Sequence, residues 1–199
     1  MTEQTNAQDD ILVWIQSAIR GDQTAYANLY EHFSAGIYRL CYGLVLNKQD
    51  AEDVLQESFV YAFKNLSRYD ANKASFKTWL YTIAVSRCRN TYRRKRFLTV
   101  DFSQILQLQL AGPNSDTPEA VIAQRESIDA IQSALVELTP NLREAIILRY
   151  GHGLTYREIA DIMDCPQKTA ESRVRLAHGK LKEVLRPVGR GLLEDLLQI

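Results

Sequence analysis

The sequence has 199 residues, enough for one large domain or two small ones, and its 46% hydrophobic content excludes wholesale disorder. The longest apolar run, Ile11–Ile15, is far too short to cross a membrane. The polar, acidic N-terminus lacks the basic start and apolar stretch of a signal peptide, so we expect a cytoplasmic protein without membrane insertion. Cys41, Cys88 and Cys165 lie too far apart for a disulfide framework or a structural zinc site, which leaves reduced, buried thiols.

The net charge of zero hides a strong segregation of charge along the chain. Residues 1–70 carry 5 basic and 10 acidic side chains, whereas residues 71–100 carry 8 basic and none acidic. Residues 101–138 are acidic again, and residues 139–199 are mixed. A concentrated basic block is the footprint expected for nucleic acid. Separate charged segments of this kind indicate separate surfaces for separate partners.

Apolar residues at helical spacing predict four helices in the first half of the chain. The first is expected over Asp10–Arg20, with Asp10 as its cap and Gly21 as its stop. Asp22 is expected to cap the second helix, whose apolar residues recur at helical spacing from Tyr26 to Ile37. The segment 47–50 is interpreted as a turn and a cap before a third helix. The third and fourth helices are expected over Ala51–Leu66 and from Ser75 to about Arg96.

A dense set of helix breakers between Gly112 and Pro118 predicts an interdomain linker over residues 97–119. Helical spacing then returns in four segments, Val121–Leu138, Asn141–Tyr150, Tyr156–Met163 and Gln167–Leu185. No strand alternation is present. The sequence therefore predicts an all-α fold of two small helical domains, 1–96 and 120–186, followed by a C-terminal extension of unknown role, 187–199.

The second domain has the pattern of a helix-turn-helix. Ala160 is small enough for a close helix crossing, Asp164 tolerates a left-handed turn, and Pro166 stops the first helix from continuing. The next helix is polar and basic, as reading a major groove requires. Its candidate DNA-contacting residues are Gln167, Lys168, Thr169, Ser172, Arg173, Arg175 and Lys180. The alternative is an ordinary helical hairpin with a solvated charged face.

Two surfaces of the first domain carry further candidates. One face of the third helix is mostly acidic with an exposed valine, which suits a basic partner with a small apolar centre; it comprises Asp53, Gln56, Glu57 and Val60. The fourth helix combines aromatic, small polar and guanidinium groups, which suit a strand with exposed bases. Its candidates are Trp79, Ser86, Arg87, Asn90, Arg93 and Arg94. A solvated acidic face and core aromatic residues, Trp79 included, are the alternatives.

These motifs, in this order, resemble those of bacterial RNA polymerase sigma factors of the extracytoplasmic-function (ECF) group. The segment Asp50-Ala-Glu-Asp-Val-Leu-Gln-Glu-Ser-Phe is similar to the polymerase-binding segment of that family's first domain. Ser75-Phe-Lys-Thr-Trp-Leu-Tyr-Thr-Ile-Ala resembles its minus-ten recognition helix. Gly153-Leu-Thr-Tyr-Arg-Glu-Ile-Ala and Ser172-Arg-Val resemble its minus-thirty-five domain. The resemblance covers roughly residues 10–96 and 120–186.

The resemblance implies a division of labour among the candidate residues. The acidic face of the third helix would bind core RNA polymerase. The loop 68–74, with Arg68, Tyr69 and Lys73, would capture a flipped minus-ten base, with Ser86 and Asn90 near the exposed strand. The recognition helix would enter the minus-thirty-five major groove. The implied partners are core polymerase, promoter DNA and, as a further candidate, an anti-sigma protein; no cofactor, metal or small-molecule substrate is implied.

Two other classes of protein compete with this interpretation. An enzyme is disfavoured because His32, His152 and His178 are scattered and no catalytic motif spacing occurs. A conventional helix-turn-helix regulator is the stronger alternative, but it would need a dimer interface and a palindromic site.

Overall fold

The computed structural model describes residues 2–95, 131 and 133–185, and within those ranges all regular structure is helical. The expected all-α fold, with a helix-turn-helix in the second half, is confirmed. The elements are α1 (Thr2–Ile19), α2 (Gln23–Val45), α3 (Lys48–Lys64), η1 (Leu66–Arg68), α4 (Phe76–Lys95), α6 (Pro140–Ile146), η3 (Ile147–Gly151), α7 (Tyr156–Met163) and α8 (Gln167–Leu185). The predicted linker 97–119 and extension 187–199 lie outside the described residues. Among the helices described, none has the length and apolarity of a membrane span.

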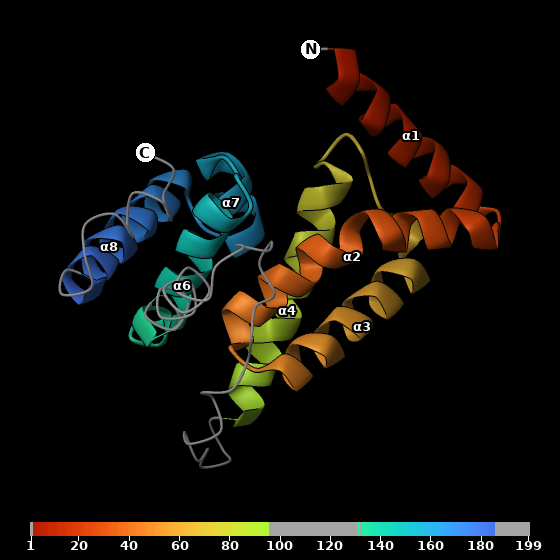
Figure 1. Ribbon diagram of the computed structural model, residues 1–199. Helices are drawn as coiled ribbons and strands as arrows, with labels where there is room; N and C mark the ends of the chain where they lie inside the picture. Colours follow the sequence, from red (N-terminus) through yellow and green to blue (C-terminus); the bar gives the residue numbers. More distant parts are fainter. Residues whose placement is uncertain (1, 96–130, 132, 186–199) are drawn as a thin grey trace, which may run out of the picture.

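Helix α2 is the centre of the first domain, with α1, α3 and α4 packed around it (Figure 1). Its buried stripe is Leu29, Phe33, Ile37 and Leu40, at the helical spacing that the sequence predicts. Asp22 caps this helix as expected, since its carboxylate accepts a hydrogen bond of 2.9 Å from the Thr24 backbone N–H.

The first helix begins earlier than predicted. It starts at Thr2, so the prediction that Asp10 caps it was wrong. A capping residue marks a helix start only where the preceding residues break the helix, and Glu3, Gln4 and Ala7 are all tolerated helix residues. The predicted stop is confirmed: Gly21 has a φ of +94°, a left-handed conformation that favours glycine.

A tight turn at residues 46–47 separates α2 from α3, so the segment 47–50 supplies the expected cap, but its residues 48–50 are already helical. Leu46 ends α2 in the left-handed region with a φ of 55°. Asn47 then caps α3, because its side-chain oxygen accepts a hydrogen bond of 3.0 Å from the Asp50 backbone N–H. Helix α3 therefore begins at Lys48, three residues before the expected start.

The second domain consists of α6, η3, α7 and α8, and the bounds of α7 and α8 agree with the predicted ones. The predicted helix Asn141–Tyr150 begins one residue earlier, at Pro140, and changes to π-helical geometry from Ile147 onward. Helix α8 buries the small and branched side chains of one stripe against α6 and α7. That stripe is Ala170, Val174, Ala177, Leu181 and Leu185.

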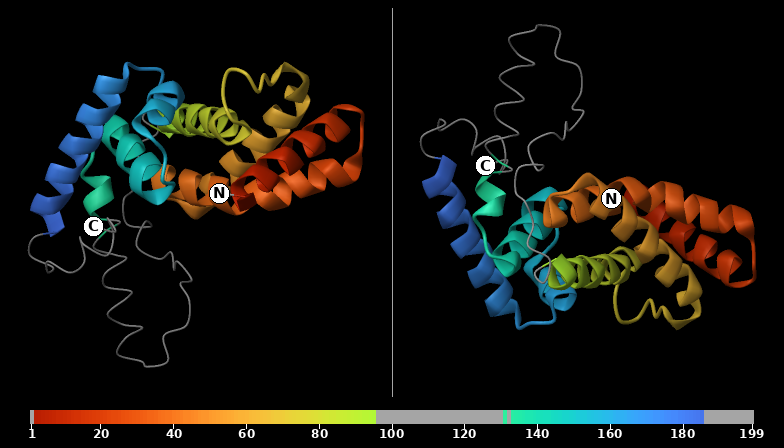
Figure 2. Two further views of the ribbon diagram at one scale, coloured as in Figure 1. Left: turned by 90° about the horizontal axis from the view of Figure 1, so that it is seen from above. Right: turned by 90° about the horizontal axis from the view of Figure 1, so that it is seen from below.

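The two domains pack directly on each other. Helix α7 lies against α4, and η3 and α6 contact α2, an arrangement that both views of Figure 2 show. The buried side chains of both domains form one continuous hydrophobic cluster, from Ile15 to Leu185. The sequence predicted two domains but not this contact between them.

The three cysteines carry free thiols. Cys41 and Cys88 are buried, and Cys165 is half-buried. A hydrogen bond with Cys41, together with burial, raises the pKa of Cys88 well above its usual value. A buried thiol of raised pKa is a poor nucleophile, so Cys88 fits the expected role of a small core residue.

Candidate nucleic-acid interface

The acidic face of α3 is exposed to solvent. Asp53, Gln56, Glu57 and Val60 are all exposed, and Val60 has 53% of its surface in solvent. The opposite face is held in the core by Val54, Ser58, Phe59 and Ala62. The helix therefore presents carboxylates around an apolar centre, as the sequence predicts. A surface of this kind suits a basic partner with a matching apolar spot.

The loop between η1 and α4 is built around Tyr69. Its hydroxyl donates a hydrogen bond of 3.1 Å to the Ala74 carbonyl, and its ring packs on Phe76 and Trp79 at 5.3 and 5.5 Å between centroids. Burial and the nearby Asp70 carboxylate raise the pKa of Tyr69. Asp70 in turn accepts a hydrogen bond of 3.0 Å from the Asn72 backbone N–H, which closes a turn. The loop is thus held in shape by its own residues.

Around this aromatic cluster, two cations and part of the Trp79 side chain remain accessible to solvent. Arg68 and Lys73 are exposed, and Lys73 lies 3.9 Å from the Asp70 carboxylate. Trp79 is half-buried between Tyr69 and Phe76, so it belongs to the cluster and still has surface in solvent. A partly exposed ring beside exposed cations is an arrangement on which an unpaired base can stack while its phosphates are held.

The C-terminal half of α4 carries polar and basic side chains that differ in exposure and in whether they already contact another side chain. Ser86, Arg93 and Arg94 are exposed. Asn90 is half-buried and accepts a hydrogen bond of 2.8 Å from the Arg93 guanidinium. The Arg87 guanidinium lies over the Tyr61 ring, 4.6 Å from its centroid, and is therefore already engaged on the surface of α3.

The turn between α7 and α8 fixes the angle of the candidate recognition helix. Thr155 and Glu158 form a capping box at the start of α7. Asp164 ends α7 in the left-handed conformation expected of it, with a φ of 50°, and the Cys165 N–H donates a hydrogen bond of 3.0 Å to the Ala160 carbonyl. Pro166 follows, and α8 starts at Gln167. This geometry is that of a helix-turn-helix.

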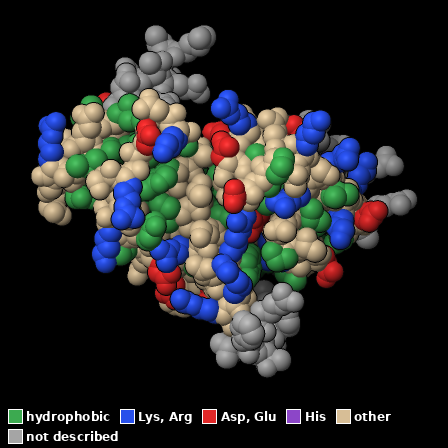
Figure 3. Space-filling model, turned by 180° about the vertical axis from the view of Figure 1, so that it is seen from behind, with side chains coloured by type: hydrophobic (Ala, Val, Ile, Leu, Met, Phe, Trp, Pro, Cys, Tyr) green, Lys and Arg blue, Asp and Glu red, His purple; other side chains and the backbone are tan. Residues whose placement is uncertain are grey.

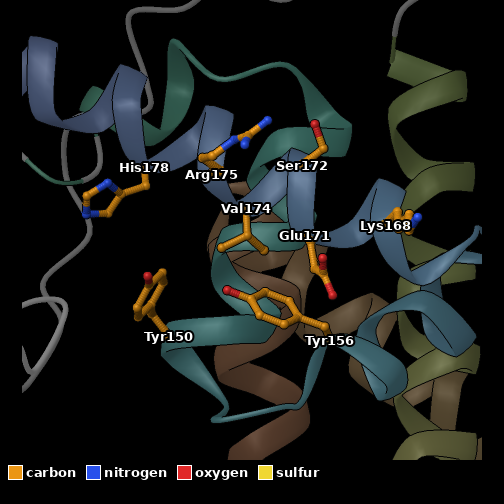
Figure 4. A pocket seen from close by; sticks show the side chains of 8 residues that line it. All are labelled: Tyr150, Tyr156, Lys168, Glu171, Ser172, Val174, Arg175 and His178. Carbon is orange, nitrogen blue, oxygen red and sulfur yellow. The ribbon is translucent and has the colours of Figure 1, made fainter.

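The exposed face of α8 carries all seven candidate residues. Gln167, Lys168, Arg175 and Lys180 are exposed, and Thr169, Ser172 and Arg173 are half-buried. An open pocket lies between this helix and the rings of Tyr150 and Tyr156 (Figure 4). Lys168, Ser172 and Arg175 line it, so donors and aromatic rings share one surface.

Charge is distributed over both domains on the face opposite to that of Figure 1. Lys and Arg side chains are spread over both halves of this view, with several near its middle, where the two domains meet (Figure 3). The zero net charge therefore does not prevent the surface from offering local cationic groups to a polyanion.

Sequence reasoning missed a set of residues that join the two domains. Arg89 forms an ion pair with Glu144. Lys77 and Tyr81 form hydrogen bonds with the carbonyl and the ring of His152. Arg89 stands in the basic end of α4, but nothing in its local sequence pairs it with a carboxylate 55 residues later. Only the tertiary structure identifies such pairs.

Comparison with protein families gives two matches, one in each domain. Residues 29–97 match Sigma-70 region 2, and residues 128–181 match Sigma-70, region 4. The first match contains the acidic face of α3, the loop 68–74 and α4. The second contains α6, η3, α7 and most of α8.

Two curated relatives are similar over almost their whole length. The ECF RNA polymerase sigma factor SigW of Bacillus subtilis is 31% identical over an alignment of 183 positions, which covers 86% of this chain and 95% of SigW. The ECF RNA polymerase sigma-E factor of Escherichia coli K12 is 32% identical over an alignment of 199 positions, which covers 96% of this chain and 100% of the relative.

Two solved structures share the fold. One is CnrH in complex with the cytosolic domain of CnrY, with a TM-score of 0.68 and 22% identity over 90% of this chain and 99% of that one. The other is the sigma factor RpoE of Bartonella quintana with the anti-sigma factor NepR, with a TM-score of 0.64 and 24% identity over 81% and 96%. With both family matches and relatives above 30% identity, the chain belongs to the ECF group of RNA polymerase sigma factors, which bind core RNA polymerase and direct promoter-specific transcription initiation.

Proposed function

We propose that three surfaces of this chain divide the work of initiation. The acidic face of α3, formed by Asp53, Gln56, Glu57 and Val60, binds core polymerase. The loop 68–74 and α4 read the minus-ten element, and the exposed face of α8 reads the minus-thirty-five element. One observation carries the proposal. The chain exposes one acidic face with an apolar centre, which suits a protein partner, and two separate polar and basic faces, which suit DNA.

The minus-ten surface works by trapping unpaired bases. Arg68 and Lys73 place exposed cations near the packed rings of Tyr69 and Trp79. Further candidates continue along α4, namely Ser86, Arg87, Asn90, Arg93 and Arg94. Flipping a base out of the duplex costs a few kcal/mol, and stacking on an aromatic ring returns about 1–3 kcal/mol per base. Because these terms nearly balance, strand opening by this protein needs no nucleotide hydrolysis.

The minus-thirty-five surface binds DNA weakly by itself. If Lys168, Arg173, Arg175, Lys180 and Lys182 each neutralise one phosphate, the slope of log K against log salt is about −4.5. That slope is modest for a protein that must find a few promoters in a genome. Core polymerase supplies the remaining affinity by holding both DNA-reading domains at high effective concentration.

Three further assignments follow from the same proposal. The protein acts without catalysing a reaction, because specific binding alone accomplishes its task. It works in the cytoplasm, where polymerase and promoter DNA meet. An anti-sigma protein is a further candidate partner, since two solved relatives of this fold are described as complexes with CnrY and with the anti-sigma factor NepR.

The test is transcription in vitro with purified core polymerase and mapped start sites. We expect the full chain to confer promoter-specific initiation, and Glu57→Ala to weaken core binding. Arg175→Ala should leave core binding intact and weaken promoter binding about tenfold, with a loss of roughly 0.9 from the salt slope if Arg175 holds one phosphate. Arg157→Ala is the matched control, because Arg157 is an exposed cation of the same domain on α7.

Two results would contradict the proposal. A chain that never joins core polymerase, or joins it without directing initiation, is not acting as proposed. Tight, specific binding of the free chain to a palindromic duplex would instead indicate a conventional helix-turn-helix regulator.

A further inference from the structure

The second domain covers the side of α4 that faces away from its candidate DNA-contacting residues. Lys77 Nζ donates a hydrogen bond of 3.2 Å to the His152 carbonyl, and the Tyr81 hydroxyl lies 3.0 Å from His152 Nδ1. At 100° per residue, Lys77 and Tyr81 lie about 140–180° around the helix from Ser86 and Asn90, and Arg89 lies between the two groups, about 60° from Ser86. The candidate minus-ten side of α4 therefore stays open while its opposite side is docked.

The strongest contact across the interface is the ion pair of Arg89 with Glu144. The Arg89 Nη2 lies 2.7 Å from Glu144 Oε2, and its Nε lies 3.1 and 3.2 Å from the two carboxylate oxygens. The Glu144 side chain is only 1% exposed, whereas that of Arg89 is 33% exposed. A carboxylate so deeply buried depends on its partner, because losing the guanidinium leaves a desolvated charge behind.

A second set of contacts ties the domains together at the end of α2. The Leu44 carbonyl accepts hydrogen bonds from Arg143 Nη1, at 3.0 Å, and from the Tyr92 hydroxyl. Arg143 also donates to the carbonyl of Leu135 in its own domain, so its guanidinium spans the interface. Next to it, Ile147 packs so closely on Gly43 that a Cβ at that glycine would lie 3.0 Å from the Ile147 Cδ1. The docking is therefore specific, with fitted apolar and polar parts.

This docked arrangement cannot read both promoter elements at once. Domains of this size have radii of gyration of about 12 and 10 Å, which correspond to outer radii of about 16 and 13 Å, so the centres of two packed domains lie roughly 30 Å apart. Promoter elements two helical turns apart are separated by about 70 Å. The second domain must therefore leave α4 before α8 can reach its element.

We propose that the docked arrangement is a self-inhibited closed state, in which Glu144 occupies Arg89 in the place of a nucleic-acid phosphate and which core polymerase opens. This inference rests on the proposed function. Glu144 acts as an internal competitor: its carboxylate offers the same bidentate acceptor geometry to the guanidinium as a phosphate does. Opening exposes Glu144 to water and frees Arg89 to join the basic end of α4.

Core polymerase can open the closed state only if it binds the separated domains more tightly than the docked ones. Its apparent affinity for the chain is then reduced by the fraction of molecules that are closed. Any change that weakens the Arg89–Glu144 pair should raise the open fraction, and with it the apparent affinity for polymerase, without adding a contact to polymerase.

The experiment measures the full chain by small-angle X-ray scattering and titrates it into core polymerase. The variants are Glu144→Gln and Arg89→Gln, alone and together, with Glu137→Gln as a control that removes one exposed carboxylate from the same domain. We expect the wild type and the control to scatter as compact particles. Both single variants should have a larger radius of gyration and an apparent Kd for core polymerase about tenfold lower.

The double variant tests whether the two residues act as one pair. If they do, removing both should open the chain no further than removing one. Glu144→Gln guards against misfolding, because its neutral amide leaves no desolvated charge behind, whereas Arg89→Gln leaves the Glu144 carboxylate without its partner; helical circular dichroism verifies each fold. An open wild type, or single variants as compact and as weakly bound as the wild type, would overturn the inference. A failure of every chain to direct initiation would instead refute the proposed function, whatever the scattering shows.

Discussion

At the scale of single residues, His152 is a group whose charge depends on contact between the domains. Burial, followed by the charges of Lys77 and Arg39, lowers the pKa of His152 to about 4. Its other neighbour, Tyr81, stays neutral, because burial raises the pKa of that phenol to about 12. His152 is therefore uncharged while the domains are docked. Two cations and a neutral phenol surround it, so a proton on its ring has no counter-charge there.

We predict that acid separates the domains through His152. A histidine in the open state titrates near 6.5, so docking keeps its full stability above that pH and loses it as the pH falls toward 4. The loss reaches roughly 3 kcal/mol at about 1.4 kcal/mol per pKa unit. Scattering between pH 7.5 and 4.5 should show the wild type expanding. His152→Asn keeps a polar side chain without the titration, and equal expansion of both proteins would rule out this role.

The exposure of the candidate residues was predictable, and their tertiary partners were not. Helical periodicity alone placed Asp53 and Glu57 on the solvent side of α3, because burial of one helix face fixes the opposite one. The partners of Arg87 and Arg89 are Tyr61 and Glu144, from other helices. Contacts of this kind depend on how helices cross, which local sequence does not encode. The arginines of α4 look alike in the sequence, but two of them, Arg87 and Arg89, already contact side chains of other helices.

At the scale of elements, breakers and caps determined how well each helix was predicted. The bounds of α7 and α8 followed from Asp164 and Pro166, since a left-handed residue and a proline leave no choice of where the chain turns. The start of α1 was wrong because polar residues before Asp10 continue the helix. The π-helical geometry of η3 has no signature in the sequence, and it arises where Ile147 packs against α2.

We predict that the capping box of α7 stabilises the DNA-reading unit. Thr155→Ala removes the hydroxyl that accepts the Glu158 N–H and donates to its carboxylate. The loss of such a cap costs about 1 kcal/mol, which lowers the Tm of a chain of this size by about 2–4 °C. Thr155→Ser keeps the hydroxyl and should unfold like the wild type in a thermal melt. Identical melting of the alanine and serine variants would show that the cap contributes nothing.

At the scale of the whole molecule, one sequence must serve two arrangements of its domains. The closed arrangement shares a hydrophobic cluster between both domains and is closed by Arg89 and Glu144. In the open arrangement, the segment between the domains must be long enough to span the distance between the two promoter elements. The sequence predicted the two domains and their separate surfaces. It did not predict the docking of the two domains, because residues such as Arg89 and Glu144 lie in helices far apart in the sequence and nothing in either helix indicates the contact between them.

The length of the segment 97–119 sets the limit of the open arrangement. Its 23 residues span at most about 80 Å when extended, and about 27 Å on average as a flexible coil. Promoter elements two helical turns apart are separated by about 70 Å, so a segment of this length spans them only when it is nearly extended. Removal of eight residues leaves 15, which reach at most roughly 50 Å. We therefore expect that deletion to abolish initiation at promoters with both elements while core binding, measured by co-purification, is kept.

The control for this deletion replaces the same eight residues with Gly and Ser, which preserves length and changes composition. If reach is what matters, the replacement should initiate and the deletion should not, because only the deletion shortens the span below the separation of the elements. Normal promoter activity of the deletion would mean that the domains need not separate as far as the DNA geometry requires. Failure of both variants would mean that specific side chains of this segment bind polymerase, so that its sequence matters as well as its length.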